Sequence, residues 1–486
     1  MMSLKEKTIS GLLWSTIDSF ANQGIQFIVG IILARLLSPR EFGLLGMISI
    51  FIAISQTFIN SGFSSALIRK KDCTQTDYST VFYYNMVMGV VMYLVLFLSA
   101  GAIANFFDEP ELKWLIRASG LNLILSSITL IQGTTLRKRV DFKLLTKIAV
   151  ISSVLSGVIG IIMAVSGYGV WSLVGRTLAG SLFSSLLLWF WNRWYPSRVF
   201  SIKSFRELFG FGSKLLISGL IDTVYNNIYY LVIGKYFAAN ELGYYTRART
   251  FSDLPSKNMN TVISRVTYPV LAQMQDDKTF LKSGYKRMIK NTMYLSFVLM
   301  TGLAVIAEPL VITLVGEAWR PSVIYLQLLC FPGIMYPLQA LNLNMLNVQG
   351  RSDLFLKLEI IKKILVVPVI IFGIIWGIKI MILGMWINTI IAYFLNSFYS
   401  GRLINYPMSE QLADIVPAFL IASVMGAAVF LIGALLPVGS PATMLFILTL
   451  AGFVIVLAIS EIFQPAAYAD IKSIIKTKLI TKRHGS

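Results

Sequence analysis

The most unusual chemistry of this sequence lies in residues 242–271, where charged side chains interrupt a largely apolar chain. Within "YYTRARTFSDLPSKNMNTVISRVTYP", Arg249, Asp253, Lys257 and Arg265 are spaced by four or eight residues and so share one side of a helix. Asp253 can pair with a cation on either side and still leave a net positive charge. Such a surface suits phosphate or carboxylate, which Arg binds in bidentate fashion and Lys attracts as a point charge.

This charge is unusual because the rest of the sequence is that of a membrane protein. Of the 486 residues, 56% are hydrophobic and 13% are charged. A bilayer core about 30 Å thick needs roughly 20 helical residues, and residues 86–107 exceed this length. A Lys or Arg at the centre of such a helix costs roughly 2.5–3.5 kcal/mol when it faces lipid. We therefore predict a water-filled cationic cavity whose substrate-binding residues are Arg247, Arg249, Lys257, Arg265, Arg117 and Arg176. The alternative is an ion-pair network that only stabilises helix packing.

Polar residues form two further stripes at helical spacing. Asp18, Asn22 and Gln26 share one face of the first predicted span, and Ser218, Asp222 and Asn226 share one face of the seventh. We expect Asn22, Gln26 and Asn226 to line the cavity. The acidic residues in the predicted spans are either candidates for proton or sodium coupling or salt-bridge partners; they are Asp18, Asp222, Asp253 and Glu359.

Fourteen apolar segments between residues 11 and 463 must position these side chains. The corner "EFGLL" at 41–45 recurs as "ELGYY" at 241–245, an offset of 200 residues. This repeat predicts an all-α polytopic membrane protein with two parallel six-helix lobes around a central cavity. The lobes would be residues 1–205 and 206–405, and residues 406–486 would add two helices and a basic tail. The alternative is that the corner is an ordinary helix–helix turn and the polar stripe a packing seam.

Most of the 42 Lys and Arg residues fall in connections on the same side as the N-terminus, which predicts cytoplasmic N- and C-termini. Attraction to anionic lipids accounts for much of the formal net charge of +19, so no nucleic-acid partner is expected. A phosphate-binding Gly-Lys-Ser/Thr loop is absent, so we expect no ATP hydrolysis. The single histidine is His484, and we predict no metal, no cofactor and no catalytic residues.

Three stretches then resemble a known family: "LARLLSPREFGLLGM" (33–47), "GFSSALIRKKD" (62–72) and "ELGYYTRA" (241–248). They are similar to the polysaccharide-transporter branch of the multidrug/oligosaccharidyl-lipid/polysaccharide flippase superfamily, of the colanic acid and teichuronic acid export type. The resemblance implies a flippase that moves an undecaprenyl-diphosphate-linked oligosaccharide across the bacterial cytoplasmic membrane by alternating access. It also implies an anionic polyprenyl-diphosphate glycan, membrane lipids and polysaccharide polymerase machinery as partners.

Other functions remain open at this point. A flippase for lipid-linked peptidoglycan precursor fits the charge equally well, and its loss would kill cells instead of removing a surface polymer. A multidrug cation antiporter of the same superfamily should have an acidic cavity. A membrane-embedded glycan polymerase should carry reactive residues in a long external loop, which this sequence lacks. A structural assembly factor is the last alternative.

Overall fold

The computed structural model describes residues 21–436, 439–470, 472 and 473. Within α9 (Ala239–Gln273), the side chains of residues 261, 262, 264–266, 268 and 269 are not described. All regular structure in the described residues is helical. The chain divides into two compact units, Met1–Gly243 and Tyr244–Ser486. The boundary therefore falls near the start of α9, within the recurring corner and directly after Gly243.

Eleven helices of the described chain are long and apolar enough to cross a bilayer, which confirms the prediction of an all-helical polytopic membrane protein. In the N-terminal unit they are α2 with α3 (Pro39–Asn60 and Phe63–Arg69), α4 (Gln75–Phe107), α5 (Leu112–Lys138), α6 (Phe142–Val165), α7 (Trp171–Asn192) and α8 (Ile202–Tyr236). In the C-terminal unit they are α10 (Lys278–Val305), α12 (Ser322–Val348), α15 (Ile378–Leu403), α16 (Met408–Leu435) and α17 (Pro441–Phe463).

Three predicted spans do not meet this criterion. The helix Ala21–Leu36 is shorter within the described residues, and α9 carries too many charged and polar side chains. The remaining span is divided into α13 (Ser352–Ile364) and α14 (Val366–Trp376). The total of fourteen membrane helices therefore stays a prediction.

Proline explains two helix breaks. A proline ring clashes with the carbonyl group four residues before it, and it cannot donate a backbone hydrogen bond. Pro309 lies four residues after Val305, where α10 ends and α11 (Ala307–Val315) follows. Pro368 lies four residues after Ile364, where α13 ends. Both breaks follow directly from the sequence.

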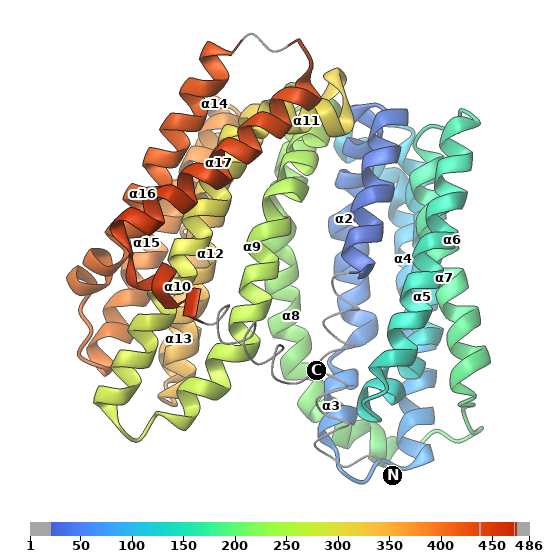
Figure 1. The fold of residues 1–486 in the computed structure, drawn as a ribbon. Coiled ribbons are helices and arrows are strands. Elements are labelled where there is room, and N and C mark those ends of the chain that lie inside the picture. The colour runs from blue at the N-terminus through green and yellow to red at the C-terminus, as the bar shows by residue number, and fades with distance from the viewer. Residues whose placement is uncertain (1–20, 437–438, 471, 474–486) are drawn as a thin grey trace, which may run out of the picture. The chain divides into compact units, whose positions relative to one another are not determined.

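In the N-terminal unit, neighbouring helices pack closely as antiparallel pairs. Figure 1 shows α4 beside α5 and α6 beside α7, while α2 packs along α8. At the junction of α3, α4 and α8, the side chains of Phe63, Leu67, Phe82 and Leu208 form a buried apolar cluster with Trp194. This unit holds one of the polar cavities considered below.

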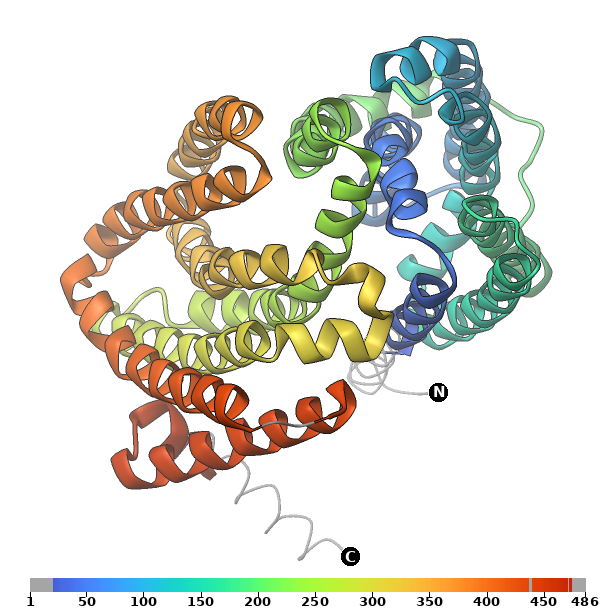
Figure 2. The ribbon, with the colours of Figure 1, turned by 90° about the horizontal axis from the view of Figure 1, so that it is seen from above.

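In the C-terminal unit, α10 packs against α12 and α16, and α16 packs against α17 (Figure 2). Ion pairs fasten the start of α10 to the start of α16. Lys286 lies 2.9 Å from Glu410 and 3.1 Å from Asp414, and Lys290 lies 3.0 Å from Asp414. These contacts hold α10, which packs against α12, and α12 forms one wall of the cavity beside α9.

Candidate functional site

The charged face predicted in residues 242–271 is formed by α9, and three of its residues make one ion-pair group. Asp253 lies between two cations, each one helical turn away. Its carboxylate is 3.1 Å from Nε of Arg249 and 2.6 Å from Nζ of Lys257. Lys257 is the most accessible of the three, with 59% of its side chain exposed. The group carries one net positive charge, as the sequence predicted.

Residues of α12 complete a small cavity around this group. The lining residues are Arg249, Ser252, Asp253, Ser256 and Lys257 from α9 and Leu329, Pro332, Gly333 and Tyr336 from α12. The volume is about 60 Å³, which accommodates a few water molecules. In this conformation the cavity therefore admits small groups only.

Two prolines loosen the hydrogen bonding of α12 beside this cavity. Pro332 has no N–H for the carbonyl of Leu328, and the indole Nε1 of Trp386 donates to that carbonyl instead at 2.6 Å. Pro337 likewise removes the helical donor for the carbonyl of Gly333, which belongs to the cavity wall. The hydroxyl of Ser252 donates to the carbonyl of Leu329 at 3.2 Å and ties α9 to α12. The cavity wall is thus polar in its backbone as well as in its side chains.

The N-terminal unit contains a second, larger polar cavity, of about 520 Å³. It brings together three residues that the sequence predicted to line a cavity, namely Asn22, Gln26 and Arg176. The other lining residues are Phe42 and Leu45 from α2, Ala149, Ser152, Ser153 and Ser156 from α6, and Leu173, Thr177, Gly180, Ser181 and Ser184 from α7. Among the described lining residues, Arg176 is the only charged one.

Arg247 and Arg117 have aromatic surroundings instead. Arg247 is buried, and its guanidinium carbon lies 5.1 Å from the ring centre of Trp319. The guanidinium carbon of Arg117 lies 4.2 Å from the ring of Phe97 and 5.0 Å from the ring of Trp114. Stacking on aromatic faces stabilises a cation inside a protein. Neither residue lines the two polar cavities described above.

The remaining predicted site residues are dispersed. Asp222 and Asn226 are exposed residues of α8. Glu359 pairs with Lys362 inside α13. Asp18 lies outside the described residues, and so does the side chain of Arg265. Their proposed roles in substrate binding or ion coupling stay predictions.

The sequence interpretation missed the serine lining of the N-terminal cavity. Ser152, Ser153 and Ser156 belong to α6, and Ser181 and Ser184 to α7. Their spacings of three or four residues place most of each set on one helix face, and this pattern was available as a signal. Small residues in membrane helices also serve close packing, so serine alone did not indicate a cavity.

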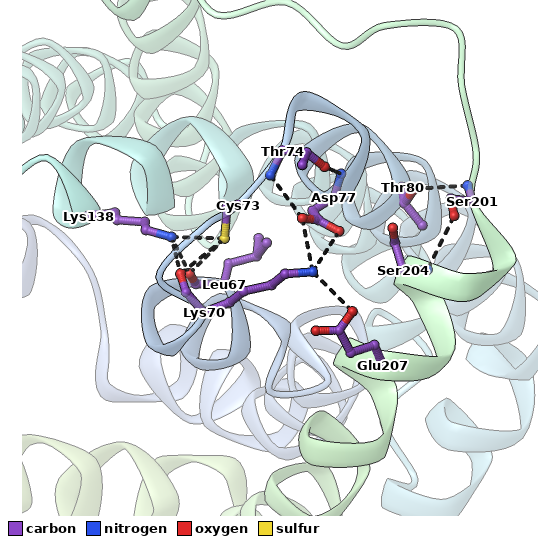
Figure 3. Close-up of polar contacts among 10 residues, drawn as sticks. All are labelled: Leu67, Lys70, Cys73, Thr74, Asp77, Thr80, Lys138, Ser201, Ser204 and Glu207. Carbon is purple, nitrogen blue, oxygen red and sulfur yellow. Dashed lines mark hydrogen bonds and ion pairs between the residues drawn. The ribbon is translucent and has the colours of Figure 1, made fainter.

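A polar cluster at the junction of α3, α4 and α8 was also not predicted (Figure 3). Lys70 Nζ lies 3.2 Å from the carboxylate of Asp77 and 3.0 Å from that of Glu207. Desolvation lowers the pKa of Lys70, but hydrogen bonds with Glu207 and Asp77 outweigh it and raise this pKa above its ordinary value. Lys138 Nζ donates to the carbonyls of Leu67 and Lys70 and lies 2.8 Å from Cys73 Sγ. The cluster therefore fastens the beginning of α8 to the preceding helices.

Many apolar membrane helices, with charged and polar cavities between them, define the architecture of a membrane transport protein. Residues 32–324 match the family described as polysaccharide biosynthesis protein, and the chain belongs to that family. The resemblance in the sequence to the polysaccharide-transporter branch of the flippase superfamily is thereby confirmed.

Curated relatives carry consistent names. The chain is 27% identical to the teichuronic acid biosynthesis protein TuaB of Bacillus subtilis, over 73% of this chain and 74% of that protein. It is 27% identical to the lipopolysaccharide biosynthesis protein WzxC of Escherichia coli, over 76% of both chains. It is also 27% identical to the succinoglycan biosynthesis transport protein ExoT of Rhizobium meliloti, over 67% of this chain and 66% of that protein.

Solved structures show the same fold. The inward closed conformation of the lipid II flippase MurJ matches with a TM-score of 0.77 at 17% identity, covering 95% of this chain and 99% of MurJ. An inward-facing multidrug resistance MATE family transporter of the MOP superfamily matches with a TM-score of 0.61 at 15% identity, covering 81% of this chain and 98% of that transporter. The protein therefore has the fold of MurJ and the MATE transporters.

Proposed function

We propose that this protein translocates an anionic oligosaccharide repeat unit, linked to undecaprenyl diphosphate, across the bacterial cytoplasmic membrane. The observation that carries this proposal is the group formed by Arg249, Asp253 and Lys257 in the wall of the cavity between α9 and α12. Family membership supports a role in polysaccharide biosynthesis, and the name of the ExoT relative refers to transport. The protein itself would catalyse no covalent step.

The ion-pair group suits a diphosphate for an electrostatic reason. Asp253 keeps Arg249 and Lys257 paired while the site is empty, which lowers the cost of two cations inside the membrane. An arriving diphosphate carries more negative charge than one carboxylate, and it can replace Asp253 as the partner of both cations. The exposed end of Lys257 makes first contact, and Arg249 then adds bidentate hydrogen bonds.

The small volume of this cavity requires a conformational change before a diphosphate can bind. We propose alternating access, in which lobes formed by residues 1–205 and 206–405 move and residues 406–486 add two further helices. In this proposal both termini are cytoplasmic. Asp18, Asp222, Asp253 and Glu359 stay the candidates for proton or sodium coupling, and Asp253 and Glu359 each form an ion pair with a lysine of the same helix. Polysaccharide polymerases would take up the translocated product.

Native mass spectrometry of the protein extracted gently from its own membrane tests the substrate. We expect a polyprenyl-diphosphate glycan to copurify with the wild type and to be lost from the double variant Arg249→Ala, Lys257→Ala. The matched control is Arg320→Ala, Arg351→Ala, which removes two cations from exposed connections. Equal lipid binding by all three proteins would overturn the role of the α9 cations.

The same measurement separates the competing functions. A copurifying peptidoglycan precursor would instead identify the protein as a flippase for lipid-linked peptidoglycan precursors. A bound organic cation would favour multidrug antiport, which the net positive charge of the α9 group disfavours. The likeness to MurJ and to MATE transporters establishes the fold and does not choose between these substrates.

A further inference from the structure

The cavity of the N-terminal unit differs in chemistry from the α9 group. It lies between the helix Ala21–Leu36, α2, α6 and α7, and its volume of about 520 Å³ is in the range of small-molecule sites. Its described lining contains one cation and no acidic side chain, and most of its other polar groups are hydroxyls. A ligand that matches it needs one negative charge and several hydroxyl groups.

Arg176 provides the charge. Gly160 of α6 accommodates its aliphatic stem, because a Cβ at position 160 would lie 2.9 Å from Cβ of Arg176. Within the part of the chain that the structure describes, Arg176 has no carboxylate partner. An arginine is costly inside a membrane unless an anion compensates its charge. The planar guanidinium forms two parallel hydrogen bonds with a carboxylate.

Ser152 is a second, independent indication of a ligand. Ser152 is 95% buried and lines the cavity, yet its Oγ has no hydrogen-bond partner in the described structure. A buried hydroxyl without a partner is costly, and rotation of the Ser152 side chain toward the cavity would let a ligand oxygen provide one. The structure thus leaves a hydroxyl and a guanidinium in the wall of the same cavity.

Neighbouring groups supply further hydrogen bonds suited to a sugar. Ser153 Oγ donates to Oδ1 of Asn22 at 2.6 Å, and Nε2 of Gln26 donates to the same oxygen at 3.3 Å. These contacts leave the amide NH₂ of Asn22 as a donor. The hydroxyl of Thr177 donates to the carbonyl of Leu173, so its oxygen can still accept a hydrogen bond.

We propose that this cavity binds an acidic sugar of the passenger glycan, with the sugar carboxylate on Arg176 and sugar hydroxyls on Ser152 and Asn22. A diphosphate fits less well, because it brings at least two negative charges to one cation. A small inorganic anion would leave most of the cavity and its hydroxyl groups unused. This inference rests on the proposed transport of a glycan and adds that the glycan contains a carboxylated sugar.

Thermal unfolding of the detergent-purified full chain tests the cavity directly. The probes are glucuronate, glucose and acetate at equal concentration and ionic strength. We expect glucuronate to raise the unfolding temperature of the wild type more than glucose or acetate. Arg176→Gln should abolish the glucuronate shift, and Arg176→Lys should retain part of it. Arg320→Gln should retain it fully, because Arg320 pairs with Glu308 and Glu317 in an exposed connection.

Ser152→Ala separates loss of ligand binding from misfolding. Among the described residues its Oγ has no hydrogen-bond partner to lose, so the variant should unfold like the wild type without ligand while its glucuronate shift is reduced. If acetate raised the unfolding temperature as much as glucuronate, the cavity would not recognise a sugar. If glucose raised it as much as glucuronate, the cavity would not recognise a carboxylate. A glucuronate shift that survives in Arg176→Gln would overturn the site itself.

A transport comparison separates this inference from the proposed function. Proteoliposomes receive a polyprenyl-diphosphate glycan that contains a uronic acid, or the same glycan after reduction of its carboxyl group. Faster transport of the acidic form, with the difference lost in Arg176→Gln, would support both proposals. Equal transport of both forms would overturn the acidic-sugar site and leave the flippase function standing. Transport of neither form by the wild type would contradict the flippase function, while the unfolding experiment still decides what the cavity binds.

Discussion

Gly43 and Gly243 each pack against the first residue of the other's helix. A Cβ at Gly43 would lie 1.8 Å from the carbonyl oxygen of Ala239, and a Cβ at Gly243 would lie 1.9 Å from the carbonyl oxygen of Pro39. Pro39 and Ala239 begin α2 and α9, and both pairs are separated by 200 residues. The recurring glycine corner therefore lets two equivalent helix starts approach each other reciprocally.

We predict that Gly43→Ala and Gly243→Ala each lower the free energy of unfolding by roughly 1–3 kcal/mol, because a methyl group cannot fit against a backbone oxygen. The double variant should cost less than the sum, since separating the two helix starts once relieves both clashes. Thermal unfolding of purified protein measures this. Gly101→Ala is the control, because outside its own helix backbone no atom of the described residues lies within 4 Å of a Cβ there. Equal effects at all three positions would contradict the prediction.

Much of the fold was predictable because membrane-spanning helices consist of long apolar segments that are visible in the sequence. The repeated corner predicted the same turn in both halves of the sequence, but it did not predict that the two helix starts meet, because spacing along the chain does not show which backbones approach closely. The partners of single arginines were not predictable. Arg247 lies on Trp319, 72 residues further along the chain, and spacing within one helix does not reveal which distant ring will meet it.

The two cavities were predictable to different degrees, because spacing in the sequence reveals contacts within one helix and not contacts between distant helices. Arg249, Asp253 and Lys257 interact within one helix, so their spacing was sufficient. The N-terminal cavity draws its lining from four helices, and only its polar or charged members Asn22, Gln26 and Arg176 stood out from the apolar background. The serines became recognisable only when α6 and α7 were placed side by side.

Asp253→Asn should strengthen diphosphate binding. The substitution removes the carboxylate that competes with the ligand for Arg249 and Lys257, and we expect the Kd for undecaprenyl diphosphate to fall roughly tenfold, or about 1.4 kcal/mol. Loss of two i, i+4 ion pairs should cost stability by roughly 0.5–1 kcal/mol. Titration of the purified protein with the lipid measures the Kd.

Asp353→Asn is the matched control for this experiment. A hydrogen bond from Arg351 lowers the pKa of Asp353 to about 2, so this carboxylate is charged at neutral pH but lies outside the cavities. Its removal should leave the Kd unchanged. Weaker binding by Asp253→Asn would show that Asp253 positions the two cations instead of competing with the ligand.

Lys70→Met should destabilise the start of α8 by roughly 1–3 kcal/mol, because it leaves the buried carboxylate of Asp77 without its cation. The folded-state pKa of Lys70 is raised above the ordinary value of 10.5. Its contribution is therefore complete below pH 10.5 and is lost as the pH rises through the folded-state pKa.

The unfolding temperatures of wild type and Lys70→Met should thus differ by a constant amount from pH 7 to pH 9 and converge above pH 10.5. Lys71→Met is the control, since Lys71 is exposed, and it should behave like the wild type throughout. Convergence already between pH 7 and pH 9 would rule out the ion pairs of Lys70 as the source of the difference.

Single cysteines test the predicted orientation in the membrane. In a background with Cys73→Ser and Cys330→Ala, the exposed positions Asp72 and Tyr168 are replaced by cysteine one at a time. A membrane-impermeant maleimide should label Tyr168→Cys in intact cells and Asp72→Cys only after the cells are opened. The reverse pattern would invert the predicted topology.

The most direct test of the account is translocation by purified protein in proteoliposomes. An undecaprenyl-diphosphate-linked oligosaccharide, labelled on its glycan, is placed in both leaflets, and its accessibility to an external glycosidase is followed over time. We predict translocation by the wild type and by Arg320→Ala, Arg351→Ala, and loss of at least most of the activity in Arg249→Ala, Lys257→Ala. Wild-type rates in the double α9 variant, at equal reconstituted protein, would contradict the proposal that this ion-pair group carries the diphosphate.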